Sequence, residues 1–401
     1  NGTIIQPGAV LLLANNANPS LFTTRYPSVS VFGYFSGNLS NGGERLALLD
    51  ASGNIVIAVH YDDENGWPTS PDGGGSSLEI IDPRGDPNAP ANWRASSAAH
   101  GTPGLPPVVP ALGNVIINEI AADNATSVSN GSLFPDWIEL RNTGGSATNI
   151  AGWSLTDNSN ARHYIFPANT IIAAGGYLTV WCDSATNDPG LHTLFSLAKN
   201  GETISLFDAN TNRADAITFG LQLTDSTIGR IGNDWQLTTP TPNAINVAAA
   251  LAPPNNLAIN EWLADPGIGG QDWLELFNRS FTAPVALRGL YLGTSNSVFH
   301  YTALSFLAPR SHAQLFCEEL PGADQLEFKL PASGSAIILS SPTGNELERI
   351  TYATQTASVS QGRLPDGASS ITTFTGSTSP GTPCPSSASP PSSSPTAKAS
   401  R

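Results

Sequence analysis

The chain has 401 residues and a formal net charge of −15, with lysine at only three positions. This balance excludes nucleic-acid binding, which needs a basic face to replace phosphate counterions, and fits an acidic protein outside the cell. No stretch is long and apolar enough to cross a membrane, and no signal peptide is visible. Methionine is absent and the chain starts in mid-pattern, so we interpret it as a mature fragment of a longer protein.

Short strands joined by turns are the dominant prediction along the chain. The 38 glycines and 32 prolines favour many turns. Residues 177–182 and 203–207 are short, rich in β-branched or aromatic residues, and bounded by Gly, Asn or Asp. No segment with helical periodicity is longer than two turns. These features predict an all-β fold.

An internal repeat organises these strands. Residues 39–50 (LSNGGERLALLD) align with residues 197–208 (LAKNGETISLFD) and, more weakly, with residues 330–339 (LPASGSAIIL). Each segment is typical of a glycine-containing turn followed by an alternating strand. Upstream segments align in the same way and end at Ala14, Cys182 and Cys317. The period is about 130 to 140 residues, which suits a domain rather than a solenoid repeat.

The middle copy opens with the most informative stretch, residues 115–157. An apolar run leads into Asn118-Glu119, and the segment DWIELRN follows at residues 136–142. In that segment Ile138 and Leu140 alternate with Glu139 and Arg141, which predicts one face in the core and one face in water. The pattern returns as INEW, DWLELFN and GLYL in the last copy, at residues 259–262, 272–278 and 289–292.

The predicted architecture is a row of tandem immunoglobulin-like antiparallel β-sandwiches in three copies, the first truncated at its N-terminus. The first copy covers residues 1–104 and lacks its opening strands; the second, 114–247, is complete; the third, 257–384, is complete but more divergent. Residues 105–113 and 248–256 are predicted proline-containing linkers, and residues 385–401 a disordered Ser/Pro tail. We also expect the first copy to be unstable in isolation, since one side of its core and a strand edge lack their cover.

The second copy, with its pattern INE, DWIEL and GW.L.D, resembles the lamin tail domain, an immunoglobulin-like β-sandwich, and the bacterial extracellular branch is the nearer match. The first copy adds later features of that branch at residues 61–69 (YDDENGWPT), 72–79 (DGGGSSLE), 92–93 (NW) and 101–104 (GTPG). The third copy departs most, having Leu290 and Tyr291 in place of Trp153 and Ser154, and it lacks the Trp-Pro loop. The resemblance implies display, adhesion or spacing, often beside secreted hydrolases or spore-coat-type kinase-like domains. It carries over no catalytic residues.

Paired carboxylates are the candidates for acid–base chemistry. They are Glu119, Asp136 and Glu139, with the counterparts Glu261, Asp272 and Glu275. The structural interpretation is favoured, because an enzyme site is not usually copied with each domain. On this interpretation Asn118 and Asp136 form strand-end turns, and Glu139 lies on the wet face. We therefore predict no catalytic residues.

Metal and cofactor sites are also not predicted. The acidic loop of residues 62–65 (DDEN) is a candidate calcium-binding site, because oxygen-rich loops can bind this ion. Its spacing is not that of an EF-hand, so a solvated loop is favoured. The six histidines are scattered and none lies within metal spacing of another. They are His60, His100, His163, His192, His300 and His312.

The three cysteines form neither a disulfide framework nor a metal-ligand cluster. Cys182 and Cys317 share their place in the repeat with Ala14, so we predict a small residue packed in a core strand. Cys384 lies at a domain end, where it is either reactive or paired with a group outside these residues.

Six tryptophans leave two interpretations open: packing between the sheets, or stacking on sugar rings as in carbohydrate-binding modules. They are Trp67, Trp93, Trp137, Trp153, Trp235 and Trp273. We favour the core for Trp153 and leave Trp67 and Trp137 open. Trp67 is the best surface candidate, because it lies in a proline-flanked loop.

Together these features predict a non-enzymatic module, extracellular or at the cell surface, that serves adhesion, display or spacing. Its expected partner is a cell-surface or matrix protein or a polysaccharide. The alternative is a glycan-binding accessory region of a secreted hydrolase. The sequence carries no signal for an oligomeric state.

Overall fold

The computed structural model describes residues 4–6, 8–49, 55–64, 66–81, 83, 86–105, 113–158, 160–232, 234–317, 325–375 and 378–382. Strands dominate these residues, so the all-β prediction is confirmed. The chain divides into two compact units, one running to Ala250 together with His300–Phe306 and the other made mainly of the residues after Leu251. The predicted boundaries of the three copies stay predictions. The Ser/Pro tail, Cys384 and most of the first linker lie outside the described residues.

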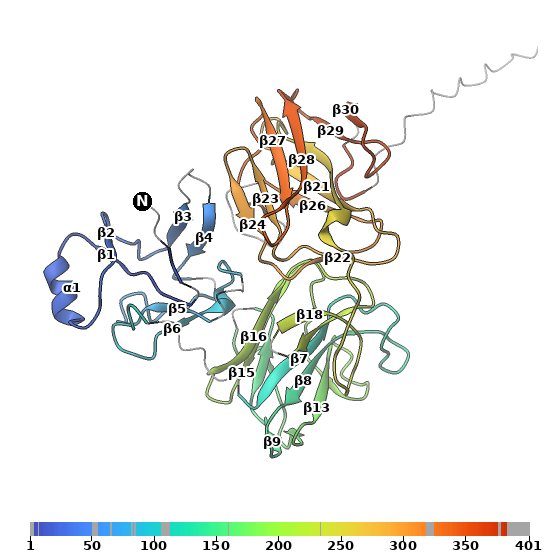
Figure 1. Ribbon diagram of the computed structural model, residues 1–401. Helices are drawn as coiled ribbons and strands as arrows, with labels where there is room; N and C mark the ends of the chain where they lie inside the picture. Colours follow the sequence, from blue (N-terminus) through green and yellow to red (C-terminus); the bar gives the residue numbers. More distant parts are fainter. Residues whose placement is uncertain are drawn as a thin grey trace, which may run out of the picture. The chain divides into compact units, whose positions relative to one another are not determined.

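The second copy is a β-sandwich. Its strands are β7 (Val115–Ala121), β8 (Asp136–Asn142), β9 (Thr148–Asn149), β10 (Ser154–Thr156), β11 (Tyr164–Ile165), β12 (Ile171–Ile172), β13 (Tyr177–Cys182), β14 (Leu191–His192), β15 (Glu202–Phe207), β16 (Arg213–Phe219), β17 (Thr227–Ile231), β18 (Asp234–Thr239) and β19 (Val247–Ala248). The larger sheet has the order β14-β13-β8-β7-β17-β18-β19, and the smaller sheet has the order β11-β10-β15-β16 (Figure 1). Strands β9 and β12 form a separate pair.

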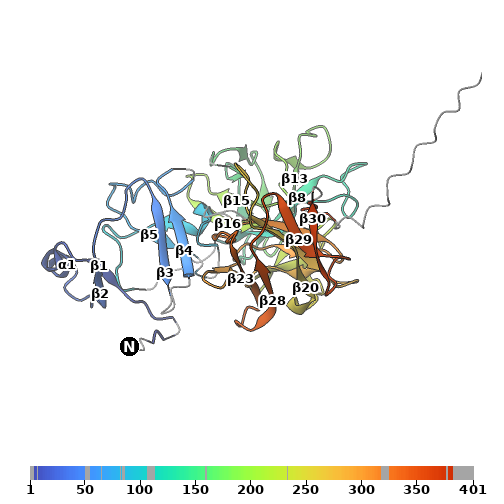
Figure 2. The ribbon, with the colours of Figure 1, turned by 90° about the horizontal axis from the view of Figure 1, so that it is seen from above.

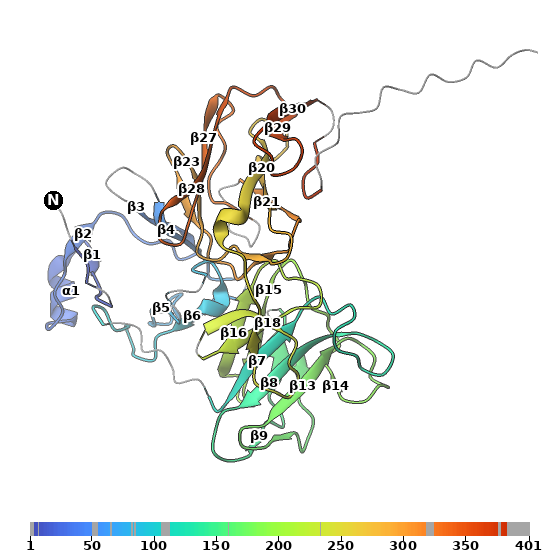
Figure 3. The ribbon, with the colours of Figure 1, turned by 45° about the vertical axis from the view of Figure 1, so that its right-hand side comes forward.

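The third copy repeats the core of this arrangement, although its larger sheet has five strands where that of the second copy has seven. It contains β20 (Leu257–Leu263), β21 (Trp273–Asn278), β22 (Val285–Ala286), β23 (Tyr291–Thr294), β24 (Val298–His300), β25 (Phe306–Leu307), β26 (His312–Phe316), β27 (Gly334–Ser340), β28 (Glu346–Ala353), β29 (Val359–Arg363) and β30 (Ile371–Thr375), and the 3-10 helix η2 (Pro254–Asn256) precedes it. The sheet orders are β26-β21-β20-β29-β30 and β24-β23-β27-β28, with the pair β22-β25. Figures 2 and 3 show β20, β23, β28, β29 and β30 of this copy from two further directions. The third copy therefore shares the topology of the second copy despite its divergent sequence.

The first copy contains only three two-stranded sheets among its described residues, with orders β1-β2, β3-β4 and β5-β6. Its elements are β1 (Leu13–Asn15), α1 (Pro19–Arg25), β2 (Gly33–Phe35), β3 (Glu44–Leu49), β4 (Ile55–Tyr61), β5 (Leu78–Ile80), η1 (Pro90–Asn92) and β6 (Trp93–Ala95). The short helix α1 begins with a proline at its first turn, and the Asn18 side chain accepts from the N–H of Leu21 at 3.3 Å. Strands β1 and β2 pair in parallel, as β13 and β14 do in the second copy.

Strands β7 and β8 lie at the centre of the second copy and are buried on both faces. The cross-strand pair Ile117–Leu140 falls on one face and the pair Glu119–Glu139 on the other. A β-bulge at Asn118 reverses the faces of Ile117 and Glu119. The prediction of a wet face at Glu139 is therefore wrong, because a closing loop after β18 covers that face. Asn118 is also not a strand-end residue, since it lies inside β7.

Candidate functional site

The closing loop of the second copy, defined as residues 240–246, is held by Glu119. This carboxylate is fully buried. Its Oε1 accepts from the Thr227 hydroxyl at 2.6 Å and from the Thr241 N–H at 3.1 Å, and its Oε2 accepts from the Thr241 hydroxyl at 3.0 Å. A side chain of the central strand β7 thus fixes a loop more than a hundred residues later in the chain.

Glu139 holds the same loop from the neighbouring strand β8. It is fully buried as well, and it accepts from the Asn118 amide at 2.8 Å and from the Asn243 N–H at 2.5 Å. Asn246 then closes the network by donating to the backbone carbonyl of Asn118 at 2.9 Å. The glutamate pair and the bulge asparagine therefore act as one anchor for the closing loop.

The third copy builds the same anchor with a different closing loop. Glu261 accepts from the Ser360 hydroxyl at 2.5 Å and from the Ser379 hydroxyl at 2.6 Å. Glu275 accepts from the Asn260 amide at 2.8 Å and from the Gly381 N–H at 2.7 Å. The repeated carboxylates of the sequence pattern are therefore brought together in each complete copy, where they hold its closing loop.

Burial sets the electrostatics of these anchors. Desolvation raises the pKa of Glu139 to about 7, against the lowering effect of its hydrogen bonds, and the adjacent Glu119 carboxylate raises it further. Desolvation likewise raises the pKa of Glu275 to about 8 and raises the pKa of Glu119. Since these side chains have no exposed surface, the raised pKa values belong to closed anchors and not to an open acid–base site.

The two aspartates of the repeated pattern each accept a hydrogen bond from a backbone N–H elsewhere in their copy. Asp136 accepts from the N–H of Asn124 at 2.9 Å, and Asp272 accepts from the N–H of Leu330 at 3.0 Å. Asp136 begins β8 as predicted, but its carboxylate bonds to a residue twelve positions earlier and does not close a local turn.

The tryptophans do not form a sugar-binding strip. Trp67 is only 7% exposed and packs against Trp93 at 5.8 Å between ring centroids, so its prediction as a surface residue is wrong. Trp137 and Trp273 are buried in the central strands. Trp153, predicted in the core, is half-buried. Trp235 is also half-buried, under the Arg230 guanidinium at 4.7 Å.

The aligned small residues of the repeat are buried as predicted: Ala14 in β1, Cys182 in β13 and Cys317 directly after β26. Burial also raises the pKa of the Cys182 thiol, which keeps it protonated and unreactive. These two thiols are therefore core-packing groups.

The acidic loop forms a turn. The Asp62 carboxylate accepts from the N–H groups of Asp63 at 2.7 Å and Glu64 at 3.1 Å, while Asn65 lies outside the described residues. Within the part of the chain that the structure describes, no three His, Cys, Asp or Glu side chains gather as metal ligands. The same residues contain no helix of the length and apolarity that a membrane crossing requires.

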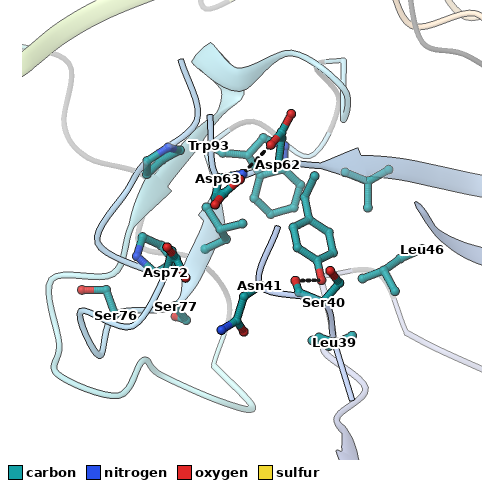
Figure 4. Close-up of a pocket in the computed structure, with 15 residues that line it drawn as sticks. Leu39, Ser40, Asn41, Leu46, Asp62, Asp63, Asp72, Ser76, Ser77 and Trp93 are labelled. Carbon is teal, nitrogen blue, oxygen red and sulfur yellow. Dashed lines mark hydrogen bonds between the residues drawn. The ribbon is translucent and has the colours of Figure 1, made fainter. Parts of the chain in front are cut away.

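The first copy contains an open cleft made of two adjoining hollows, of about 410 Å³ and about 600 Å³. Both are lined by Leu39, Ser77, Leu78 and Trp93. Figure 4 shows the first hollow, with Leu39 and Leu46 on one side and Trp93 on the other. The cleft lies where the complete copies are filled, and the sequence indicated it only through the missing opening strands.

Comparison with known proteins gives one match. Residues 109–220 match the family model described as Lamin Tail Domain, which covers the second copy from before β7 to the end of β16. No curated protein matches the chain, and no solved structure matches it.

Proposed function

We propose, from the lamin tail domain in residues 109–220, that the chain is a non-catalytic module that displays or spaces partners in a secreted or cell-surface assembly. The observation that carries this proposal is the use of the repeated glutamates. In both complete copies they are buried and hydrogen-bonded to the closing loop. A repeated motif that holds a loop in each copy supports the structure of a scaffold and does not supply a reaction site.

Two further observations support an interaction role. The net charge of −15 keeps such a protein from non-specific association with acidic surfaces. The tryptophans that would bind a glycan, Trp67, Trp137 and Trp273, are buried. A protein partner is therefore favoured over a polysaccharide.

A turnover screen tests the non-catalytic part of the proposal. The full chain is incubated with chromogenic glycosides, esters, peptides and phosphomonoesters, beside the variants Glu119→Gln and Glu275→Gln. We expect no turnover by any of the three proteins. Turnover by the parent chain that is lost in either variant would overturn the proposal and restore the acid–base interpretation of the carboxylates.

A glycan array tests the choice of partner. The full chain is applied with and without calcium, and we expect no saturable binding to any sugar. Binding to a defined sugar by the folded chain would replace the protein-interaction function with glycan binding. Calcium-dependent binding would direct attention to the acidic loop around Asp62.

A further inference from the structure

We infer that the cleft of the first copy is a docking site for a two-stranded β-hairpin of the β7–β8 type, one that carries a cross-strand pair of glutamates and is supplied by a segment outside residues 1–401. This inference rests on the proposed interaction function and names the partner. Three parts of the first copy carry it: a hairpin with an uncovered apolar face, a preserved closing loop and two strand edges.

The β3–β4 hairpin of the first copy is the counterpart of β15–β16 and β27–β28. All three carry a β-bulge at the same step, after Leu48, Leu206 and Leu339 respectively. The turn before the hairpin is also shared, because Glu44 accepts from the N–H of Ser40 at 2.8 Å, as Glu202 does from Ala198 at 2.6 Å. The register of the three hairpins is therefore the same.

This shared register allows burial to be compared position by position. Leu46 is 39% exposed and Leu48 is 55% exposed, whereas the counterparts in β15, Ile204 and Leu206, are fully buried. The counterparts in β27 are Ile337 and Leu339, and they are fully buried too. The complete copies cover these positions with the sheet that contains β7 and β8 or its equivalent. In the first copy, Leu46 and Leu48 of β3 therefore face the position that this sheet occupies in the complete copies.

The closing loop is preserved in the first copy although the glutamates that it would hold are absent. Thr102, Thr241 and Ser379 each begin a turn in which their carbonyl accepts from the residue three positions later, at 3.2, 3.0 and 3.0 Å. Two residues further on, Gly104, Asn243 and Gly381 all have positive φ, at 79°, 62° and 73°. In the complete copies these loop positions donate to the two glutamates.

The hydroxyl that completes the glutamate site also has its counterpart. Thr227 and Ser360 donate to Glu119 and Glu261, and Ser77 holds the same place directly before β5. The pairing with the following strand is also kept, because the Ser96 N–H donates to the Ser77 carbonyl at 2.8 Å. Ser77 lines both hollows of the cleft.

Two strand edges frame the cleft. In the second copy β13 pairs with β8 and β17 pairs with β7, so the central hairpin lies between them. Among the described residues, their counterparts β1 and β5 pair only with β2 and β6. Such edges present unpaired backbone groups to an incoming hairpin. The apolar face of β3 matches the apolar face of that hairpin, and the closing loop matches the face that carries the glutamates.

One side chain departs from the complete copies. Glu79 stands where they have Gly229 and Gly362, and it accepts from the Thr102 hydroxyl at 3.0 Å and from Arg94 at 3.0 Å. A carboxylate of the first copy thus occupies the place at the closing loop that Glu119 takes in the second copy. When the hairpin docks, a glutamate of the hairpin takes this place and displaces the Glu79 carboxylate.

The test uses the full chain and a fluorescent peptide of residues 114–143, the hairpin of the second copy. We expect saturable binding in fluorescence anisotropy. The variant Leu46→Asp should weaken binding at least about tenfold, equivalent to about 1.4 kcal/mol. The matched control Leu21→Asp changes an exposed leucine of α1 outside the cleft lining and should leave binding within about twofold.

A second peptide tests the glutamate pair. The peptide with Glu119→Ala and Glu139→Ala keeps the apolar face and should bind at least about tenfold more weakly. Hydrogen–deuterium exchange then locates the parent peptide, and we expect slower exchange in β1, β3, β5 and residues 102–105. This readout also shows whether Leu46→Asp leaves the first copy folded as in the parent chain.

Absence of saturable binding, equal binding by Leu46→Asp with unchanged exchange, or protection confined to the second or third copy would each overturn the inference. Any of these results leaves the proposed scaffold function standing. Enzymatic turnover in the earlier screen would remove that function whatever the peptide does, so the two failures are distinguishable.

Discussion

The first and second copies contain the same hairpin with opposite surroundings. In both, a glutamate-capped turn leads into two strands with a bulge at the same step. Leu206 is fully buried in the second copy, while its counterpart Leu48 is 55% exposed in the first copy. Local sequence therefore forms the hairpin without its cover, and burial depends on strands that lie elsewhere in the chain.

The difference shows what the central pair β7–β8 contributes. One face of the pair covers the apolar side of the smaller sheet, and the other face binds the closing loop through Glu119 and Glu139. The pair thus joins three layers that are remote in sequence. A copy without it keeps its turns and hairpins but has little buried apolar area, which is the main source of folding free energy.

The largest expected effect comes from truncating the aligned leucines. Leu206→Ala should reduce the free energy of unfolding of the second copy by about 2–5 kcal/mol, because it leaves a cavity in a filled core. Leu48→Ala in the first copy should cost less than about 1 kcal/mol. Hydrogen–deuterium exchange in increasing urea, followed at residues 202–219 and 44–61, measures both changes. Equal costs would mean that the two hairpins have the same cover in solution.

The next effect comes from the anchoring carboxylates. Glu119→Ala should lower the free energy of unfolding of the second copy by about 2–3 kcal/mol, because it removes the acceptor of the Thr241 and Thr227 donors. Glu79→Ala is the matched change in the first copy, and we expect a loss below about 1 kcal/mol at this partly open site. Urea unfolding read at residues 234–248 and 93–105 compares them. A larger loss for Glu79→Ala would contradict the role assigned to the central pair.

A smaller effect is expected from Gly229→Ala. A Cβ at this position would lie 2.6 Å from the Asn246 amide and 2.9 Å from the Thr238 hydroxyl. We expect a loss of about 1–2 kcal/mol through overpacking. Gly232→Ala has open space around its Cβ and a strained positive φ of 63°, which Gly229 lacks, so it reports the cost of backbone strain without overpacking. Thermal unfolding measures the change. An equal midpoint temperature for Gly229→Ala and the parent chain would show that the closing loop shifts to accommodate the added methyl group at little cost.

The last expected effect is a dependence of stability on pH. The pKa of Glu139 is raised to about 7 and that of Glu275 to about 8, so the folded state binds protons that the unfolded state releases above its pKa near 4.5. Their stabilising contribution is complete below pH 4.5 and is lost as pH rises through 7 to 8. Differential scanning calorimetry should show a midpoint that falls by several degrees over this interval. Glu139→Gln with Glu275→Gln should flatten the slope, and an unchanged slope would assign it to other groups.

The site was predictable in part. The sequence placed Glu119 and Glu139 in one repeated motif and favoured a structural role for them, which the buried hydrogen bonds support. The sequence pattern predicted that Glu139 lies on a solvent-exposed face. This was wrong because the alternation of apolar and polar residues along one strand carries no information about a loop near residue 241 that covers the strand. The burial of Trp67 was missed for a similar reason, since its partner Trp93 lies 26 residues later.

The sequence by itself determined the all-β class, the turns, the internal repeat and the buried small residues of Ala14, Cys182 and Cys317. These follow from local rules: side-chain alternation, glycine and proline in turns, and matched spacing between copies. Only the tertiary structure decided which face of each strand is covered, that the bulge asparagine and two glutamates hold a distant loop, and that the first copy has an open cleft. Those features depend on contacts between segments about a hundred residues apart, whose pairing no local pattern encodes.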